Sequence, residues 1–182
     1  MDPRPTREAR TWLAVRHEVA TLLNDVDETS FGTAVTELLT PRRRWFVTGQ
    51  GRSGLVASMA AMRLMHLGLD VHVLGEPTTP SVRAGDGLLV ISGSGETPVS
   101  VHFARTAAKL GARTLVMTAR PTSTLAALAD LVMPVPSAET GQFGGSLFEQ
   151  GALLILDAVV MTLAAERGDT HEQMHARHTN MQ

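Results

Sequence analysis

Cysteine is absent from the 182-residue chain, and lysine occurs once, at Lys109. Without cysteine there is no disulfide framework, no thiolate metal site and no cysteine nucleophile. With one lysine and no Gly-Lys-Ser/Thr sequence, a phosphate-loop ATPase is also excluded. Any anion that this protein binds is therefore expected to be held by backbone amides, hydroxyl groups or arginine.

Aromatic residues and net charge are also scarce. The chain has five Phe, two Trp and no Tyr, and 16 basic residues against 18 acidic ones give a net charge of −2. A base-stacking surface and a basic face are both missing, so the sequence argues against a nucleic-acid partner. Residues 1–10 contain no apolar signal core, and the longest apolar stretch, residues 151–165, is shorter than the ~18 residues that span a membrane. We therefore expect a soluble, cytoplasmic protein with no membrane partner.

The distribution of apolar residues predicts one domain over residues 1–182. Between Trp12 and Val26 these residues recur at spacings of three and four, which indicates a helix, and Thr29 or Ser30 is the expected N-cap of a second short helix. Beyond residue 40, short apolar runs alternate with helical patterns. The expected strands are residues 45–47, 71–74, 88–91, 114–117 and 131–135, and the expected helices are residues 53–67, 98–110, 123–128 and 146–167.

Strands that are apolar throughout are buried on both faces, which is typical of a parallel sheet covered by helices. The predicted fold class is α/β, a doubly wound five-stranded parallel sheet flanked by helices, with helices before it and a helical tail after it. Helix 146–167 is apolar almost all the way round, so we expect it to be central or to contact another subunit. Asp157 lies in this helix and is expected to have a structural partner, because an unpaired buried charge is costly.

Two glycine-rich turns follow the first and third expected strands, at the edge where doubly wound sheets bind ligands. Residues 49–54, Gly-Gln-Gly-Arg-Ser-Gly, fit the spacing G-x-G-x-x-G, and Glu76 stands where a dinucleotide fold places its ribose-binding acid. A dinucleotide site is one alternative. Against it, no second mononucleotide-binding half follows the five strands, and such a site has no need of the hydroxyl groups in the other turn.

That other turn, residues 92–97, has the sequence Ser-Gly-Ser-Gly-Glu-Thr. Its glycines allow successive backbone amides to face one point at the start of a helix, which forms an anion site, and Ser92, Ser94 and Thr97 add neutral donors. The alternative is a tight turn in which Ser94 or Thr97 only caps the helix. Three hydroxyls and two glycines in six residues exceed what a cap requires, so a phosphate monoester is the favoured ligand.

These turns and several other segments together resemble the sugar-isomerase domain family and, within it, the 6-phospho-3-hexuloisomerases. The resemblance rests on residues 51–54, 62–68, 73–80, 92–97, 148–149, 156–158 and 176–178. It extends over nearly the whole chain. It implies a homo-oligomer, usually a tetramer with sites near subunit contacts. It also implies isomerisation of a small-molecule sugar phosphate, 6-phospho-3-hexulose, to fructose 6-phosphate through a cis-enediol, without cofactor or metal.

The resemblance also implies roles for individual residues. The phosphate is bound by Ser53, Ser92, Ser94 and Thr97, the general base is Glu149, and His178 handles protons. A carboxylate near the start of a mostly apolar helix loses hydration, which raises its pKa toward the range useful for a base. The alternative for Glu149 is a first-turn charge that complements the helix dipole. An imidazole titrates near neutrality without help, but His178 by itself has the pattern of a solvated tail residue.

Three further residues are candidates at the same site. Arg52, in the first glycine turn, is expected either to neutralise phosphate or hold sugar hydroxyls, or to be a surface arginine; Gly51 belongs to the same turn. Thr79 either lines the site or serves only in the turn that it forms with Pro80. The Gly-rich loop 137–145 is expected to shape the substrate pocket, so the exact sugar phosphate stays open.

The tail contains a different motif. Residues 171–175, His-Glu-Gln-Met-His, fit H-E-x-x-H, a zinc-protease pattern in which a helix places both histidines on one face. Only His178 follows as a further ligand and no walls for a cleft remain, so we expect no metal site. Two alternatives to a hexulose-phosphate isomerase stay open: an isomerase of another sugar phosphate, and a non-catalytic sugar-phosphate sensor. The sensor is disfavoured because neither a helix-turn-helix segment nor a basic face accompanies the domain.

Overall fold

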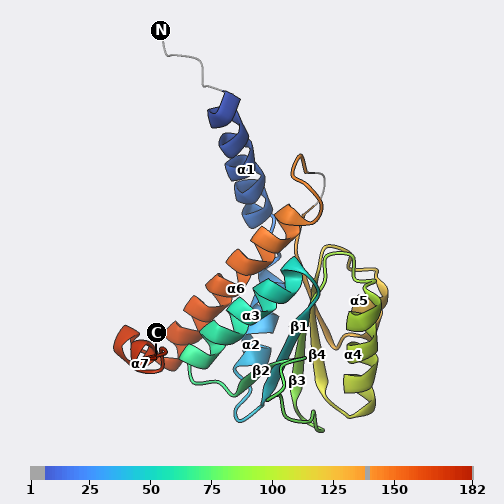
Figure 1. Ribbon diagram of the computed structural model, residues 1–182, viewed down its shortest axis with the longest axis vertical. Coiled ribbons are helices and arrows are strands. Elements are labelled where there is room, and N and C mark those ends of the chain that lie inside the picture. Colours follow the sequence, from blue (N-terminus) through green and yellow to red (C-terminus); the bar gives the residue numbers. More distant parts are fainter. Residues whose placement is uncertain (1–6, 138–139, 182) are drawn as a thin grey trace.

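The computed structural model describes residues 7–137 and 140–181 and places a five-stranded parallel sheet between two layers of helices (Figure 1). The strands are β1 (Trp45–Gly49), β2 (Val71–Val73), β3 (Gly87–Ile91), β4 (Arg113–Thr118) and β5 (Leu131–Pro134). The helices are α1 (Arg7–Asn24), α2 (Glu28–Leu38), α3 (Arg52–His66), α4 (Pro98–Lys109), α5 (Thr124–Leu128), α6 (Ser146–Arg167) and α7 (His171–Ala176). The predicted α/β fold with five parallel strands is confirmed.

The sheet order is β2-β1-β3-β4-β5, so the chain changes its direction across the sheet between β1 and β3. These two strands are paired over their full lengths, from Trp45 beside Gly87 to Gly49 beside Ile91. The glycine turns that follow them therefore leave the sheet side by side at its carboxyl edge. This is the switch point at which doubly wound sheets bind their ligands.

Both faces of the sheet are covered, and alternate residues of each strand enter different cores. Trp45, Val47 and Leu89 pack with residues of α2, α3 and α6. Phe46 and Leu88 pack on the opposite face with residues of α4 and α5. Successive side chains of a strand point to opposite faces, so a sheet with two covered faces needs strands that are apolar at every position.

The N-cap of α2 differs from the prediction. The side chain of Asp27 caps the helix by accepting the backbone N–H of Ser30 at 2.7 Å. Thr29 and Ser30, the expected caps, are helical residues of the first turn. Asp, Ser and Thr are all good N-caps, so the residue types alone did not identify the capping position, and the prediction of Thr29 or Ser30 is wrong.

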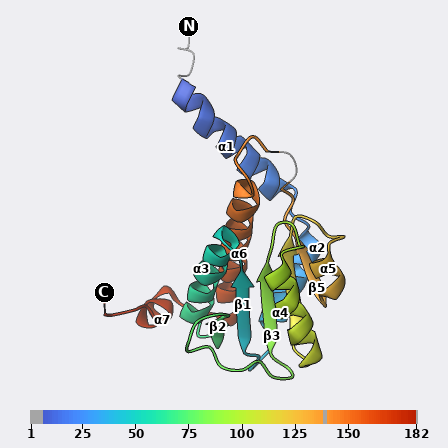
Figure 2. The ribbon, with the colours of Figure 1, turned by 45° about the vertical axis from the view of Figure 1, so that its right-hand side comes forward.

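α1 projects from the rest of the molecule, with its first half away from the other labelled elements (Figures 1 and 2). Among the α1 residues whose side chains are described, Leu22 alone is buried. Trp12 is 57% exposed and carries the Arg16 guanidinium 5.6 Å from its ring centroid. The apolar stripe predicted for this helix therefore has a partner in the chain only at its carboxyl end.

α6 buries one face against α1, α2 and α3 and leaves the opposite face uncovered. Leu154 is 38% exposed and Met161 is 73% exposed on this uncovered face. Asp157 is half-buried, and no residue in the described parts of the chain forms a hydrogen bond or ion pair with its carboxylate. The structural partner expected for Asp157 is therefore not found.

The length argument against a membrane span is wrong for α6. The helix has 22 residues, beyond the apolar stretch 151–165 at both ends, and by length and composition alone it is able to cross a membrane. Half of its most apolar window is buried inside the fold. This packing against α2 and α3 is the arrangement of a core helix.

Candidate active site

The turn of residues 92–97 connects β3 to α4. Ser92 is buried, Thr97 is half-buried and Ser94 is exposed. The hydroxyls of Ser92 and Thr97 lie 3.3 Å apart, and Ser94 Oγ accepts the backbone N–H of Glu96 at 3.2 Å. Thr97 stands at the N-cap of α4, yet no side-chain hydrogen bond caps this helix. The hydroxyls of the turn therefore do not cap α4 through a hydrogen bond, which disfavours the alternative of a turn that serves only as a cap.

Two glycines of this turn allow close contacts. Gly95 has a φ of +65°, and a Cβ there would collide with the hydroxyl of Ser123. A Cβ on Gly93 would lie 3.0 Å from the ring of Phe148, at the start of α6. The turn therefore packs directly on Phe148, and Glu149, the next residue, is brought to the same edge of the sheet.

Glu96 would repel a phosphate if its carboxylate faced the turn. Instead, Glu96 Oε1 accepts the backbone N–H of Thr124 at 2.7 Å, at the start of α5. Hydrogen bonding to Thr124 lowers the pKa of Glu96, and a negative charge is favourable at a helix N-terminus. The carboxylate is thus held by α5, which leaves the amides and hydroxyls of the turn for a ligand.

The first glycine turn forms the start of α3. Gly51 is the N-cap residue with a φ of +57°, and no atom lies within 4 Å of the position that a Cβ would take. Ser53 follows in the first helical turn and is 7% exposed. Because no side chain caps α3, its first amide groups are free to bind an anion.

Arg52 and Glu149 form the charged pair of the site. Arg52 Nε donates to Glu149 Oε2 at 2.5 Å, and the side chains are 60% and 14% exposed respectively. The pair borders a cavity of about 230 Å³ whose other walls come from α3 and α6. Sequence reasoning placed both residues at the site but did not foresee the pair, because they lie 97 positions apart.

Gln150 is a residue of this site that sequence reasoning missed. It borders the same cavity, and its Nε2 donates to Gln142 Oε1 at 2.9 Å. Gln142 in turn donates to Glu18 at 2.9 Å, and Glu18 also accepts the hydroxyl of Thr140 at 2.6 Å. These hydrogen bonds lower the pKa of Glu18. α1 therefore holds the loop before α6; residues 138–139 of this expected pocket loop lie outside the described residues.

Thr79 lies in the turn after β2. Its hydroxyl donates to the carbonyl of Val73 at 2.5 Å, and its backbone N–H donates to the carbonyl of Glu76 at 3.0 Å. These two bonds close the turn and use the hydroxyl proton of Thr79. They favour the structural role of Thr79 over a contact with substrate.

His178 lies far from Glu149 within one chain. Its ring stacks on that of His66 at a centroid distance of 5.1 Å, at the last residue of α3. Arg52, the partner of Glu149, is the first residue of that helix, and the helix rises about 21 Å between its two ends. The structure therefore brings Arg52, Glu149 and the two glycine turns together but keeps His178 apart.

The H-E-x-x-H motif, residues 171–175, lies entirely within α7. Thr170 and Gln173 form a capping box at the start of this helix, which has no buried residue. Within residues 7–137 and 140–181, no three His, Cys, Asp or Glu side chains are grouped so that they hold a metal ion.

A family model agrees with this site. The SIS domain model matches residues 38–163, a range that covers the whole sheet, both glycine turns and most of α6. The chain belongs to the SIS domain family. The resemblance to sugar-isomerase domains seen in the sequence is therefore confirmed, and a dinucleotide-binding domain is not favoured.

Curated relatives and solved structures of SIS domains narrow the resemblance. A 3-hexulose-6-phosphate isomerase of Mycobacterium gastri is 45% identical over 176 residues, which cover 92% of this chain and 88% of the relative. One from Methylomonas aminofaciens is 37% identical over 173 residues, which cover 90% and 96%. A Methanococcus jannaschii protein, whose crystal structure was taken to infer the same function, has a TM-score of 0.85 at 28% identity, covering 95% of this chain and 99% of that one. The name denotes the activity called 6-phospho-3-hexuloisomerase above, so the narrower resemblance is confirmed as well.

Proposed function

We propose that this protein is a 3-hexulose-6-phosphate isomerase. The relatives at 37–45% identity over most of the chain support this function. The structural observation that carries it is the shielded carboxylate of Glu149, placed beside a cavity and next to an anion-binding turn. The reaction breaks the C2–H bond of 6-phospho-3-hexulose, forms an enediol across C2 and C3, and delivers a proton to C3. The hydroxyl proton moves from O2 to O3, so the conversion to fructose 6-phosphate needs no oxidant or reductant.

The phosphate group is proposed to bind at the turn 92–97 and at the start of α3. The hydroxyls of Ser92, Ser94, Thr97 and Ser53 are proposed to donate to its oxygens, together with backbone amides at the start of α3 and in the turn before α4, whose first residue, Pro98, has no N–H. Helix N-termini attract anions through these amides and through the helix dipole. An anchored phosphate fixes the distance from C6 to the reacting carbons, which places C2 and C3 at Glu149.

Glu149 is proposed as the base that takes the C2 proton and returns it to C3. Its pair with Arg52 fixes the direction of the carboxylate. A guanidinium has five N–H donors, so Arg52 also has donors left for the sugar hydroxyls or the phosphate. Arg52 thereby links the group that moves the proton to the site that holds the anion.

The active enzyme is proposed to be a homotetramer. α3 exposes Leu55, Met59 and Met62, and α6, which packs against α3, exposes Met161. α1 exposes Trp12 on a separate, projecting surface. Uncovered apolar surfaces of this kind mark contacts with partners, and two different surfaces are what a tetramer with dihedral symmetry requires.

A neighbouring copy also accounts for the position of His178. Within one chain it lies at the wrong end of α3 for the proposed chemistry. We place its proton transfer, between O2 and O3 of the enediol, in the site of a second copy. We also propose a cytoplasmic location, because the named relatives are metabolic enzymes.

A coupled assay tests the function. Formaldehyde and ribulose 5-phosphate, with a hexulose-phosphate synthase, supply the substrate, and the formation of fructose 6-phosphate is followed. Turnover proportional to the amount of protein and unchanged by a chelator is expected. Calorimetric binding of fructose 6-phosphate without turnover would identify a sensor instead, and neither binding nor turnover would point to another sugar phosphate. Light scattering tests the assembly, and a stable monomer would contradict the tetramer.

A further inference from the structure

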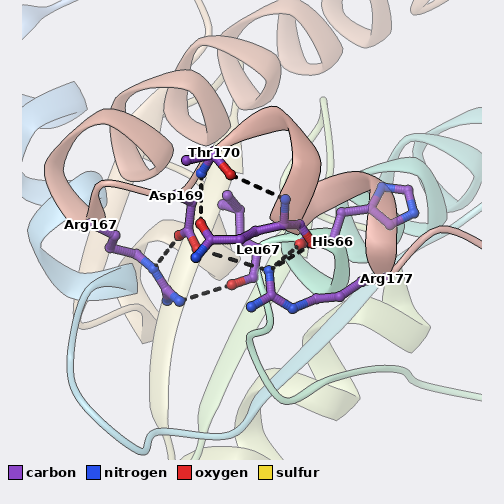
Figure 3. Close-up of polar contacts among 7 residues, drawn as sticks. His66, Leu67, Arg167, Asp169, Thr170 and Arg177 are labelled. Carbon is purple, nitrogen blue, oxygen red and sulfur yellow. Dashed lines mark hydrogen bonds and ion pairs between the residues drawn. The ribbon is translucent and has the colours of Figure 1, made fainter.

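Two arginines from the end of the chain cap the carboxyl end of α3 (Figure 3). The last carbonyl groups of a helix have no partner within the helix. Here the carbonyl of Leu67 accepts Arg167 Nη2 at 2.8 Å, and that of His66 accepts Arg177 Nη1 at 2.9 Å. Asp169 lies 2.8 Å from Arg167 Nε and 3.8 Å from Arg177 Nη1, with its side chain 10% exposed. We call Arg167, Asp169 and Arg177 the arginine clamp.

Gly68 makes room for one arm of the clamp. It follows the C-cap residue of α3 with a φ of +79°, a conformation in which glycine commonly ends a helix. A Cβ at this position would lie 3.1 Å from both Cζ and Nε of Arg177. A side chain at residue 68 would therefore strain the backbone and push the guanidinium of Arg177 aside by a few tenths of an ångström.

The clamp orders the residue that follows it. His178 is exposed, and its ring lies against the 4% exposed ring of His66 at 5.1 Å with 20° between the planes. Arg177 thus bonds the backbone of the same histidine whose ring supports His178. α7 has no fully buried residue, although Met174 packs partly buried against the core. The guanidinium of Arg177 adds the polar contact that ties this segment to the end of α3. The ring of His175 also stacks on that of His178, at a centroid distance of 6.1 Å with 27° between the planes, and His178 Nδ1 lies 3.1 Å from the carbonyl oxygen of Thr179. His178 is nevertheless exposed, so it remains accessible to a neighbouring molecule.

We propose that Arg177 is a positioning residue, which fixes His178 for proton transfer in the active site of a neighbouring copy. This inference rests on the proposed function of His178. Arg177 acts through His178 and does not touch the substrate, because its guanidinium is engaged by the carbonyl of His66 and by Asp169. Loss of Arg177 therefore lowers kcat and leaves KM unchanged.

Kinetics of four variants test this coupling in the intact oligomer, verified for each by light scattering. H178A is expected to lower kcat by about 100-fold, the scale of one general acid–base group. R177M is expected to lower kcat by about tenfold at unchanged KM, and R177K, which keeps a cationic donor, recovers part of the loss. The double variant R177M/H178A turns over no more slowly than H178A, because a residue that acts through another adds nothing once that residue is gone.

A pair of glycine variants makes the same test with Arg177 in place. Gly68 and Gly85 both have positive φ, +79° and +86°, so alanine strains the backbone at either position. The new methyl group meets Arg177 at residue 68 and open space at residue 85. G68A is expected to lower kcat severalfold at unchanged KM, whereas G85A turns over like the wild type. This pair keeps the test decisive even if R177M does not fold.

The outcomes separate the two proposals. If H178A retains the wild-type kcat, the proposed role of His178 is wrong and the positioning role falls with it. If H178A is impaired while R177M and G68A turn over normally, His178 acts without Arg177 and only the positioning role is wrong. Losses that add fully in the double variant would also overturn it, since independent residues behave in that way.

Discussion

Arginine side chains lie at both ends of α3, but they interact with different groups at the two ends. At the amino end, the 60% exposed Arg52 pairs with Glu149, and no side chain caps the first amides. At the carboxyl end, Arg167 and Arg177 donate to the last carbonyls and share the 10% exposed Asp169. One end of the helix has open backbone donors, and the other has its backbone acceptors filled by the chain itself.

This difference shows how one helix separates binding from anchoring. The positive end of a helix attracts anions, and the sugar phosphate of the proposed function is such an anion. The negative end needs cations, which the arginine clamp supplies. An end left without an internal partner is suited to a ligand, whereas an end satisfied internally holds the fold and orders the tail.

The largest expected effect breaks the amino end. Glu149→Gln keeps the size of the side chain but removes the carboxylate that accepts the proton. Turnover is expected to fall roughly 10²–10⁴-fold, with loss of deuterium exchange at C2 and with sugar-phosphate binding retained. The coupled assay and proton NMR in deuterated water measure both quantities. Exchange at the wild-type rate would exclude Glu149 as the base.

The next effect removes hydroxyls from the anion site. A Ser92→Ala/Ser94→Ala double variant is expected to weaken fructose 6-phosphate binding by roughly 100-fold or more, because each hydrogen bond to a charged group contributes about 1.5–3 kcal/mol. Titration calorimetry measures the affinity. Ser100→Ala is the matched control in the same region, since that buried hydroxyl has no hydrogen-bond partner, and its affinity should match the wild type. If the wild type, the double variant and Ser100→Ala bind with equal affinity, the phosphate does not bind at this turn.

A direct comparison of the two ends uses Arg52→Met and Arg167→Met. The first should lower kcat/KM by about tenfold and change stability little, because an exposed ion pair contributes about 0–1 kcal/mol. The second should lower the free energy of unfolding by about 1–2 kcal/mol through the lost bond to Leu67, with a smaller loss of kcat/KM than Arg52→Met, because Arg177 keeps its own bond to His66. Urea unfolding and the coupled assay give both values. The opposite pattern, activity lost at Arg167 and stability lost at Arg52, would contradict the separation of binding from anchoring.

The smallest expected effect concerns pH at the carboxyl end. Burial, followed by the charges of His178 and Arg63, lowers the pKa of His66 from its ordinary value of 6.5. At a pH between the two pKa values, His66 is protonated in the unfolded chain but neutral in the folded chain. The free energy of unfolding is therefore largest above the ordinary pKa of 6.5 and decreases as the pH falls below it. The Tm should drop between about pH 7.5 and pH 5.5, and His66→Phe should show a shallower drop in scanning fluorimetry. Parallel curves would mean that His66 does not contribute.

The sheet and its switch point were predictable because their signals are local. Strand 88–91 is apolar at every position, and it ends in a turn of serine and glycine. The same pattern recurs at residues 45–51, so two glycine turns at one edge followed from the order of the elements. The N-cap of α2 was less predictable, because Asp27, Thr29 and Ser30 all suit that role.

The pairings within the site were not predictable, because they depend on how distant elements pack. Arg52 meets Glu149 only because α6 lies along α3, and Glu18 reaches Gln142 only because α1 crosses the start of α6. The uncovered face of α6 is a similar case. An all-round apolar helix does not reveal which face the chain covers and which it leaves for another copy.

The sequence by itself determined the class of fold and the positions of the two glycine turns, because apolar periodicity and turn chemistry depend on near neighbours in the chain. With one lysine and no cysteine, it also predicted that amides, hydroxyls and arginine bind any anion. Tertiary structure alone decided the partner of each charged side chain and the separation of Glu149 from His178. A charge pairs with whatever the packing brings within a few ångströms, and that distance is set by the whole fold.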